Sequence, residues 1–341
     1  MHSWSHIPPA LQPKEVMFFS ADVVGSTSVK QNFVPTEDGL IPDKSEWFHD
    51  LQSFYINAVD LFFQQYEELS QKEGLRYQLS IKQPRVWKTI GDEILFWVEI
   101  TDTRQVLTHL RCWMNAIDKL KVHLFDMKLD VKCTAWIAHF PWRNKVIFTS
   151  PTGYSGRDKG QREENNLQLM RGYFEGLEGL PTDLPKDLIP DFVGPGLDIG
   201  FRLAEQASQR RFVVSTDVIY MLAKTATSLD MRPDLIKIHF EGLQLLKGVL
   251  QGLEYPIFWI DMAQPDDIYS YGNDLQKRNL CRPGEVEGFM KQFYHQRHNY
   301  MYAPFIVSET EEILRDYPAW YYREHNKMLR KAGFQFAEEL P

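Results

Sequence analysis

Short apolar runs alternate with longer, helically spaced segments over the first part of the chain. Residues 15–24, EVMFFSADVV, are an apolar run followed by the polar GSTS, a pattern that predicts a buried strand. Residues 26–44 hold two prolines and a glycine and are expected to form a loop. A long helix is predicted from Asp43 or Ser45 to Gly74, because apolar residues recur at three- and four-residue spacing: Trp47, Leu51, Phe54, Tyr55, Ala58, Phe62 and Tyr66.

A hairpin, a second helix and another strand are predicted next. In residues 85–100, RVWKTIGDEILFWVEI, two apolar runs flank Gly91-Asp92, as in a hairpin with that pair in or beside the turn. Residues 101–126 have one apolar helical face, and residues 129–140 alternate in part, as a half-buried strand does. The predicted order is therefore strand, helix, hairpin, helix, strand.

The pattern breaks at residues 150–190, where four prolines and many charges predict an insertion or a functional loop. Regular elements then resume. The pattern predicts, in order, a helix over 198–209, a strand over 211–215, a short helix over 217–225 and two strands within 234–261.

The last 79 residues differ in composition from the rest. They are rich in aromatic and charged residues, with helical stretches near 283–301 and 308–332. We therefore expect a main domain over residues 1–262, with the insertion at about 150–190, and a C-terminal helical extension over 263–341.

Charge and composition exclude several classes of protein. The 46 acidic and 38 basic residues give a formal net charge of −8, which disfavours nucleic-acid binding because a phosphate backbone requires a basic surface. No apolar run reaches the length of about 18 residues that spans a bilayer, and the N-terminus has no signal-peptide pattern. Three cysteines without metal-ligand spacing are typical of a reducing compartment, so the sequence predicts a cytoplasmic protein.

Two aspartates stand where a predicted strand meets a tight turn. Asp22 ends the first strand, and Asp92 lies at the hairpin turn. Taken singly, each suits a turn for purely structural reasons. If both turns lie at one edge of one sheet, however, the two carboxylates and a backbone carbonyl suit Mg²⁺ or Mn²⁺, which bind hard oxygen ligands and substrate phosphates.

Three segments together resemble the class III nucleotidyl cyclases, the family of adenylate and guanylate cyclases. FFSADVVGSTS is similar to the family's first metal motif, and KTIGDEILF to its second, K-x-x-G-D. The segment from Asp191 to Arg202 aligns without gaps on D-x-x-G-x-x-V-N-x-x-x-R, with Leu197 for Val and Asp198 for Asn. The resemblance covers roughly residues 15–261 and implies an α+β fold with a ferredoxin-like catalytic core.

The resemblance also implies catalytic roles. Asp22 and Asp92 would bind two divalent metal ions, with the backbone carbonyl of Val23 as a further ligand. Arg202 would stabilise charge that develops on the phosphate in the transition state. Asp198 stands where the family has the asparagine that positions the ribose, so this position departs from the family. Sites in this family form between two chains, so a homodimer with shared sites is expected.

Further residues are assigned to the substrate by the same resemblance. Phe19, Lys88 and Asp191 would bind the nucleotide, with Lys88 and Asp191 contacting the base. Lys247, in LLKGVLQG, is the candidate for a lysine on the triphosphate, although it equally suits a solvated hairpin. Lysine and aspartate offer one donor and one acceptor, which suit adenine, uracil and cytosine alike.

A narrower resemblance bears on the base. The IGDEILFW stretch, the GLDIGFRLAEQAS run, the charged insertion and the aromatic C-terminal extension are similar to the bacterial pyrimidine cyclases of the anti-phage Pycsar systems. This implies UTP as the first candidate substrate, CTP as the second and ATP as the third, with a product that acts on a separately encoded effector.

Two alternatives belong to other classes. A degenerate cyclase domain would only bind nucleotide or a partner, but it would be expected to lack a metal aspartate or the arginine, and Asp22, Asp92 and Arg202 are all present. Diguanylate cyclases and polymerase palm domains also use carboxylates on a ferredoxin-like sheet. The turn I-G-D-E-I has one glycine where diguanylate cyclases have G-G-[DE]-E-F, so it fits that group less well.

Overall fold

Four adjacent strands of a seven-stranded sheet come from the first 140 residues. In the computed structural model, β1 (Lys14–Val24) pairs antiparallel with β5 (Glu93–Ile100) and β6 (Asp130–Phe140), and β5 pairs antiparallel with β4 (Arg85–Ile90). Helix α2 (Glu46–Tyr77) connects β1 to β4, and α3 (Arg104–Phe125) connects β5 to β6. The order β6-β1-β5-β4 is ferredoxin-like, which confirms the predicted α+β fold.

The structure describes most of the chain outside the insertion. The described residues are 4, 7–31, 33–37, 39–42, 46–77, 79–149, 166–167, 169–171, 189–229, 237–263, 268, 271–272, 280–307 and 313–334. Most of the predicted insertion over 150–190 therefore lies outside the described residues. Its two ends are joined, since β7 (Lys145–Thr149) pairs antiparallel with β8 (Ile189–Val193).

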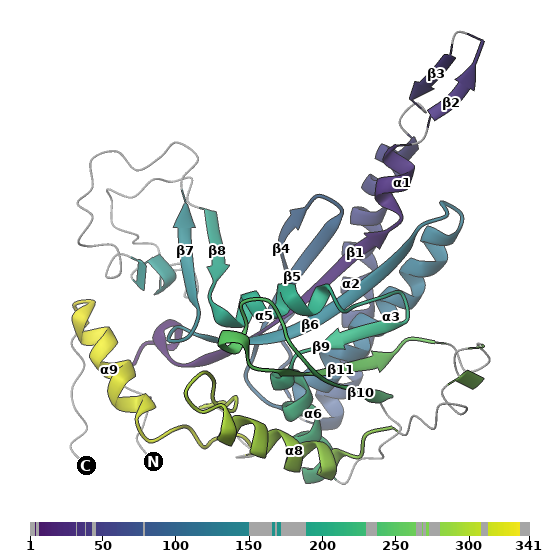
Figure 1. Cartoon of the computed structure of the whole chain (residues 1–341). Helices are drawn as coiled ribbons and strands as arrows, with labels where there is room; N and C mark the ends of the chain where they lie inside the picture. The colour runs from purple at the N-terminus through teal and green to yellow at the C-terminus, as the bar shows by residue number, and fades with distance from the viewer. Residues whose placement is uncertain are drawn as a thin grey trace, which may run out of the picture.

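Three more strands extend the sheet beyond β6, and Figure 1 shows how they lie. Strand β9 (Arg211–Val214) runs parallel to β6, followed by β11 (Tyr255–Asp261) and β10 (Ile238–Gln244). Helix α5 (Pro195–Ala204) precedes β9, and α6 (Thr216–Ser228) follows it. These elements match the predicted order of helix, strand, helix and two strands.

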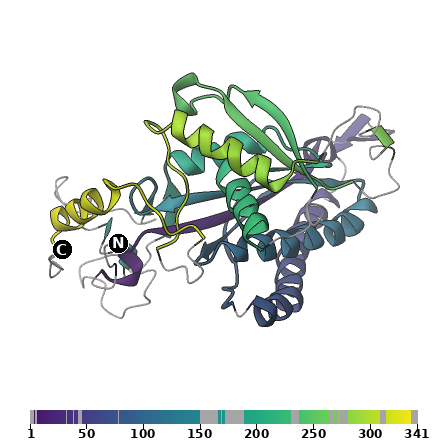
Figure 2. The ribbon, with the colours of Figure 1, turned by 90° about the horizontal axis from the view of Figure 1, so that it is seen from below.

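Side chains of β1 alternate between two cores, because successive residues of a strand face opposite sides of the sheet. Phe19 packs under the helices, with its ring 5.4 Å from that of Phe62 and 5.3 Å from that of Trp113. Phe18 packs on the other side, stacked 5.5 Å from Trp136. Figure 2 shows α2 and α3 side by side against one face of the sheet.

Two local predictions near the first helix are wrong. The expected loop over 26–44 contains a short helix, α1 (Ser26–Lys30), and a hairpin of β2 (Phe33–Thr36) and β3 (Gly39–Pro42). Gly39 has φ +124°, a conformation open to glycine, and this allows the tight turn. Helix α2 continues past Gly74, which does not adopt the left-handed conformation that ends helices; Asp43 and Ser45 lie outside the described residues.

The C-terminal extension packs into both cores. Helix α8 (Pro283–Gln296) contacts α6, where the Tyr294 hydroxyl donates to Asp217 Oδ1 at 2.7 Å. Helix α9 (Tyr321–Lys331) contacts the other core, where the Tyr321 hydroxyl lies 2.6 Å from His139 Nε2. Within the described part of the chain, no helix is long and apolar enough to cross a membrane.

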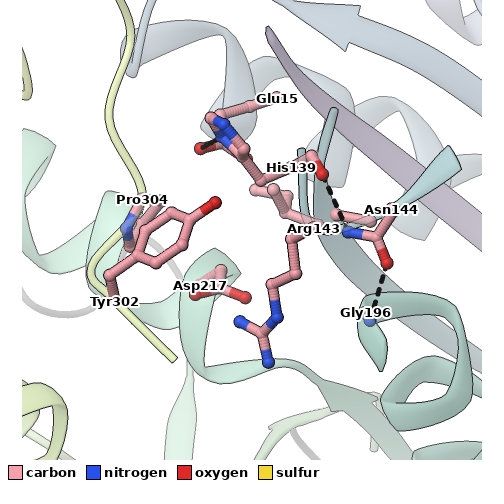
Figure 3. Close-up of a pocket in the computed structure, with 10 residues that line it drawn as sticks. Glu15, His139, Arg143, Asn144, Gly196, Asp217, Tyr302 and Pro304 are labelled. Carbon is pink, nitrogen blue, oxygen red and sulfur yellow. Dashed lines mark hydrogen bonds and ion pairs between the residues drawn. The ribbon is translucent and has the colours of Figure 1, made fainter. Parts of the chain in front are cut away.

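A small polar cavity lies where the extension meets the sheet. It is lined by Glu15, His139, Arg143, Asp217 and Tyr302 among others, and Figure 3 shows these side chains around it. Burial raises the pKa of Asp217 to about 7, against the opposing effects of Arg143 and the Tyr294 hydrogen bond. The cavity measures about 10 Å³, enough for one water molecule, so it cannot accept a nucleotide.

Candidate active site

The two metal motifs meet at one edge of the sheet. Asp22 lies near the end of β1, and Asp92 occupies the β4–β5 turn after Gly91, whose φ of +65° suits a tight hairpin. The β1–β5 register places Asp22 opposite Glu93, and the Val23 N–H donates to the Asp92 carbonyl at 3.2 Å. Two segments 70 residues apart in sequence are therefore held together by main-chain contacts.

Cations and hydroxyls surround these carboxylates. Lys132 Nζ lies 3.0 Å from Asp22 Oδ2, and Lys30 Nζ lies 3.8 Å from Asp92 Oδ2, which also accepts a hydrogen bond from Ser26 Oγ. Burial raises the pKa of Asp22 above its usual range; Lys132 opposes this rise, and the charge of Asp92 adds to it. The edge therefore holds concentrated negative charge that lysine ammonium groups only partly neutralise.

Glu93 is a third carboxylate beside Asp22 and Asp92, and sequence reasoning missed it. Its Oε1 accepts from Ser20 Oγ, and its pKa is raised by burial and further by the charges of Asp22 and Asp92. A signal was present in the sequence, because Glu93 directly follows the turn aspartate and would pair near Asp22 if the two strands are neighbours.

The donor set of this edge fits a hard divalent cation. It offers the carboxylates of Asp22 and Asp92 and nearby main-chain carbonyls, while Lys132 and Lys30 already act as cationic partners of the two aspartates. Nowhere in the described ranges do three or more His, Cys, Asp and Glu side chains gather to hold one ion. A metal bound here would complete its shell with water and substrate oxygens, as Mg²⁺ commonly does.

Lys88 and Asp191, the predicted base-contacting pair, also lie together. Lys88 on β4 and Asp191 on β8 form an ion pair with Nζ 2.7 Å from Oδ1. Both side chains are about one-third exposed, so a ligand can reach them. The 103 residues that separate them in sequence carry no local signal for this contact, which the family resemblance alone predicted.

Arg202 and Lys247 form a third group. Arg202 lies on α5, four residues after Asp198 and on the same helical face. Its Nε donates to the main-chain carbonyl of Lys247 at 3.2 Å, and its Nη1 pairs with Glu205 at 2.6 Å. The Arg202–Glu205 pair is exposed, so it is weak and open to exchange for a phosphate.

Two glycines allow α5 to lie directly against β6. A Cβ atom at Gly200 would stand 2.2 Å from the Trp136 ring, and one at Gly196 would stand 2.9 Å from the Ala138 side chain. The close approach sets the position of Asp198 and Arg202, since both are carried by α5.

Replacing Gly200 with alanine is expected to destabilise the protein by about 1–3 kcal/mol, because the helix must move off Trp136. Gly288→Ala is the matched control: Gly288 lies inside α8, and a Cβ atom there would meet nothing within 4 Å beyond its chain neighbours and its own helix backbone, so alanine should be neutral or stabilising. Urea unfolding of both variants measures the difference. Equal stabilities would contradict the close packing of α5 on Trp136.

The predicted site residues lie in three groups in the structure, and one predicted residue, Phe19, belongs to none of them. Asp22, Val23 and Asp92 form the first group, Lys88 and Asp191 the second, and Asp198, Arg202 and Lys247 the third. Phe19 is fully buried against α2 and α3, so its predicted contact with substrate is wrong.

Among the described residues, no hydrogen bond or ion pair joins Arg202 to either metal-motif aspartate. A cavity of about 620 Å³ opens beside Val24 and Gly25, but its lining includes none of the predicted residues. The groups of one chain therefore do not enclose a nucleotide in either cavity described above.

Comparisons with known proteins find nucleotide cyclases among the solved structures, at low similarity. No family model matches the chain, and no curated protein matches it in sequence. The adenylyl cyclase CyaB from P. aeruginosa aligns with a TM-score of 0.45 and 11% identity, over 75% of this chain and 98% of that one. The guanylate cyclase domain of RhGC from Catenaria anguillulae, solved with GTP, aligns with a TM-score of 0.42 and 9% identity, over 73% of this chain and 97% of that one. Likenesses this distant assign no activity, which must be argued from the side chains.

Proposed function

We propose that the chain is a class III nucleotidyl cyclase that converts a pyrimidine nucleoside triphosphate, UTP first and CTP second, into its 3′,5′-cyclic monophosphate and pyrophosphate. The observation that supports this best is the meeting of Asp22 and Asp92. Each belongs to a separate cyclase-like motif, and the Val23–Asp92 main-chain bond holds the two motifs at one sheet edge.

The reaction needs little covalent chemistry from the protein. The ribose 3′-oxygen attacks the α-phosphorus, the bond from that phosphorus to the bridging oxygen breaks, pyrophosphate leaves, and the hydroxyl proton passes to solvent. Bound at Asp22, Asp92 and the Val23 carbonyl, two divalent ions, Mn²⁺ or Mg²⁺, would lower the pKa of the 3′-hydroxyl and neutralise the leaving pyrophosphate. Arg202 would stabilise the charge on the α-phosphate.

A second copy of the chain completes the site in this proposal. Arg202, Asp198 and Lys247 lie on an exposed part of α5 and the loop after β10, and within the described part of the chain no hydrogen bond or ion pair joins them to Asp22 or Asp92. A two-fold dimer would place the third group of each protomer opposite the first group of its partner and give two equivalent sites.

Substrate choice gives a direct test. Purified protein with Mn²⁺ and each of the four nucleoside triphosphates is expected to convert UTP fastest, then CTP, with ATP and GTP slower. A base that leaves a polar contact unmatched should lose roughly ten- to a hundred-fold per contact. Mass spectrometry of the products measures this ranking. Cyclic UMP would then act on a separately encoded effector in anti-phage defence, as the resemblance to Pycsar cyclases suggests.

Adenylate cyclase activity is the second candidate. The Lys88–Asp191 pair supports it, because one donor and one acceptor match N1 and the amino group of adenine as well as they match a pyrimidine. ATP as the best of the four substrates would overturn the pyrimidine proposal and support this one. Nucleotide binding without any cyclic product would instead indicate a degenerate domain.

A further inference from the structure

Trp87 occupies an irregular position in β4, next to the base-contacting pair. The β4–β5 register pairs Val86 with Phe96 and then Lys88 with Leu95, so Trp87 is an extra residue without a partner on β5. Such a bulge changes the direction of the side chains around it. Trp87 and Lys88 would face opposite sides of a regular strand, yet Lys88 Nζ lies 4.3 Å from the centre of the Trp87 ring.

Trp87 also holds Asp191. Its indole N–H donates to Asp191 Oδ1 at 3.0 Å, the same oxygen that accepts from Lys88 Nζ at 2.7 Å and from the Phe192 main-chain N–H at 2.9 Å. Three donors therefore share one oxygen. Among the residues that the structure describes, none donates to Oδ2, which leaves that oxygen as the acceptor on the exposed side of the pair.

The ring of Trp87 is itself fixed by packing. Its centre lies 5.2 Å from that of Phe18, 5.1 Å from that of Phe192 and 6.2 Å from that of Phe201. Phe201 precedes Arg202 on α5, so one aromatic cluster connects β1, β4, β8 and α5. A rigid ring that contacts both polar groups restricts the rotamers of each.

We propose that Trp87 is a positioning residue that determines base specificity. It holds Asp191 Oδ1 and the Lys88 ammonium in a fixed arrangement, so that Oδ2 and the remaining ammonium protons meet one acceptor–donor edge of the base. This inference rests on the proposed function, because it assigns Lys88 and Asp191 to the base. The inference adds Trp87 as the residue that keeps the spacing of Lys88 and Asp191 rigid. Discrimination between bases depends on that rigidity, since a mobile pair adapts to several bases.

Trp87→Phe tests this role, because phenylalanine keeps a ring in the cluster and removes the indole N–H. We expect kcat/KM for the best nucleotide to fall, mainly through KM, and its ratio to kcat/KM for the worst nucleotide to narrow by about ten-fold. Trp97→Phe is the matched control. Trp97 lies in the same aromatic cluster, 5.4 Å from Phe192, and makes none of the hydrogen bonds to Asp191. The ranking of the four nucleotides by kcat/KM in Trp97→Phe should match that of the wild type.

Affinities of the four nucleotides, measured by calorimetry with Ca²⁺ in place of Mn²⁺, separate this inference from the proposed function. A wild-type protein that makes no cyclic product, but ranks the nucleotides in a way that Trp87→Phe abolishes, would reject the cyclase proposal and support the role of Trp87. An active wild type whose ranking survives in Trp87→Phe would overturn this inference alone. A wild type that neither binds nor converts any nucleotide would overturn both.

Discussion

Asp92→Ala is expected to lower cyclic nucleotide formation by at least about a thousand-fold, because it removes a carboxylate proposed to bind both metal ions. Lys30 and Ser26 contact this carboxylate, and both would remain without supplying a metal ligand. Asp22→Ala should have the same effect, since both aspartates are proposed to bind the same ions. The loss should appear in kcat, because the metals serve the transition state more than they serve binding of the base.

Stability measurements distinguish this loss from misfolding. Asp22 and Glu93 already have raised pKa values in the native state, partly because of the charge of Asp92. Removing Asp92 relieves that repulsion, so the thermal midpoint should stay the same or rise. Asp60→Ala on the exposed side of α2 is the control and should keep full activity. Near-normal turnover by Asp92→Ala would refute the assignment of this edge to metals.

Local patterns were sufficient to predict the strand and the hairpin that carry Asp22 and Asp92. The apolar run before Asp22 and the paired runs around Gly91-Asp92 determine a strand and a hairpin through contacts close in sequence. The order of elements then places both turns at one edge, because a ferredoxin-like sheet sets the first strand beside the second strand of the hairpin. That is the observed pairing of β1 with β5.

The period of a strand also explains the one wrong site residue. Asp22, Ser20 and Phe18 share one face of β1, whereas Phe19 faces the helices. Phe19 stands three residues before Asp22, and an odd separation in a strand means the opposite face. The two-residue period would therefore have placed Phe19 on the face away from the Asp22 side chain from the sequence alone.

Long-range contacts were beyond prediction from local pattern. The β7–β8 pairing crosses the whole insertion, and the donation from Arg202 to the Lys247 carbonyl crosses 45 residues. Neither has a periodic or turn signal. The bulge at Trp87 depends on how β4 pairs with β5, so the sequence gives no indication that Trp87 and Lys88 lie on the same side.

Mixing two inactive variants should restore activity if the site is shared between chains. The Asp92→Ala chain has a defective first group and an intact third group. The Arg202→Ala chain has an intact first group and a defective third group. A mixed dimer has one site with both defects and one site with neither. Because random exchange makes about half of the dimers mixed, the mixture should reach roughly a quarter of wild-type activity.

A second mixture serves as the control for this rescue. Asp22→Ala and Asp92→Ala remove ligands from the same group, so no arrangement of two such chains contains an intact site, and their mixture should stay inactive. Differently tagged chains and native mass spectrometry establish that mixed dimers form in both cases. Inactive mixed dimers of Asp92→Ala and Arg202→Ala would contradict the shared site. The exposed face of α5 that carries Asp198 and Arg202 would then have to act on a nucleotide within its own chain, where none of its described contacts reaches Asp22 or Asp92.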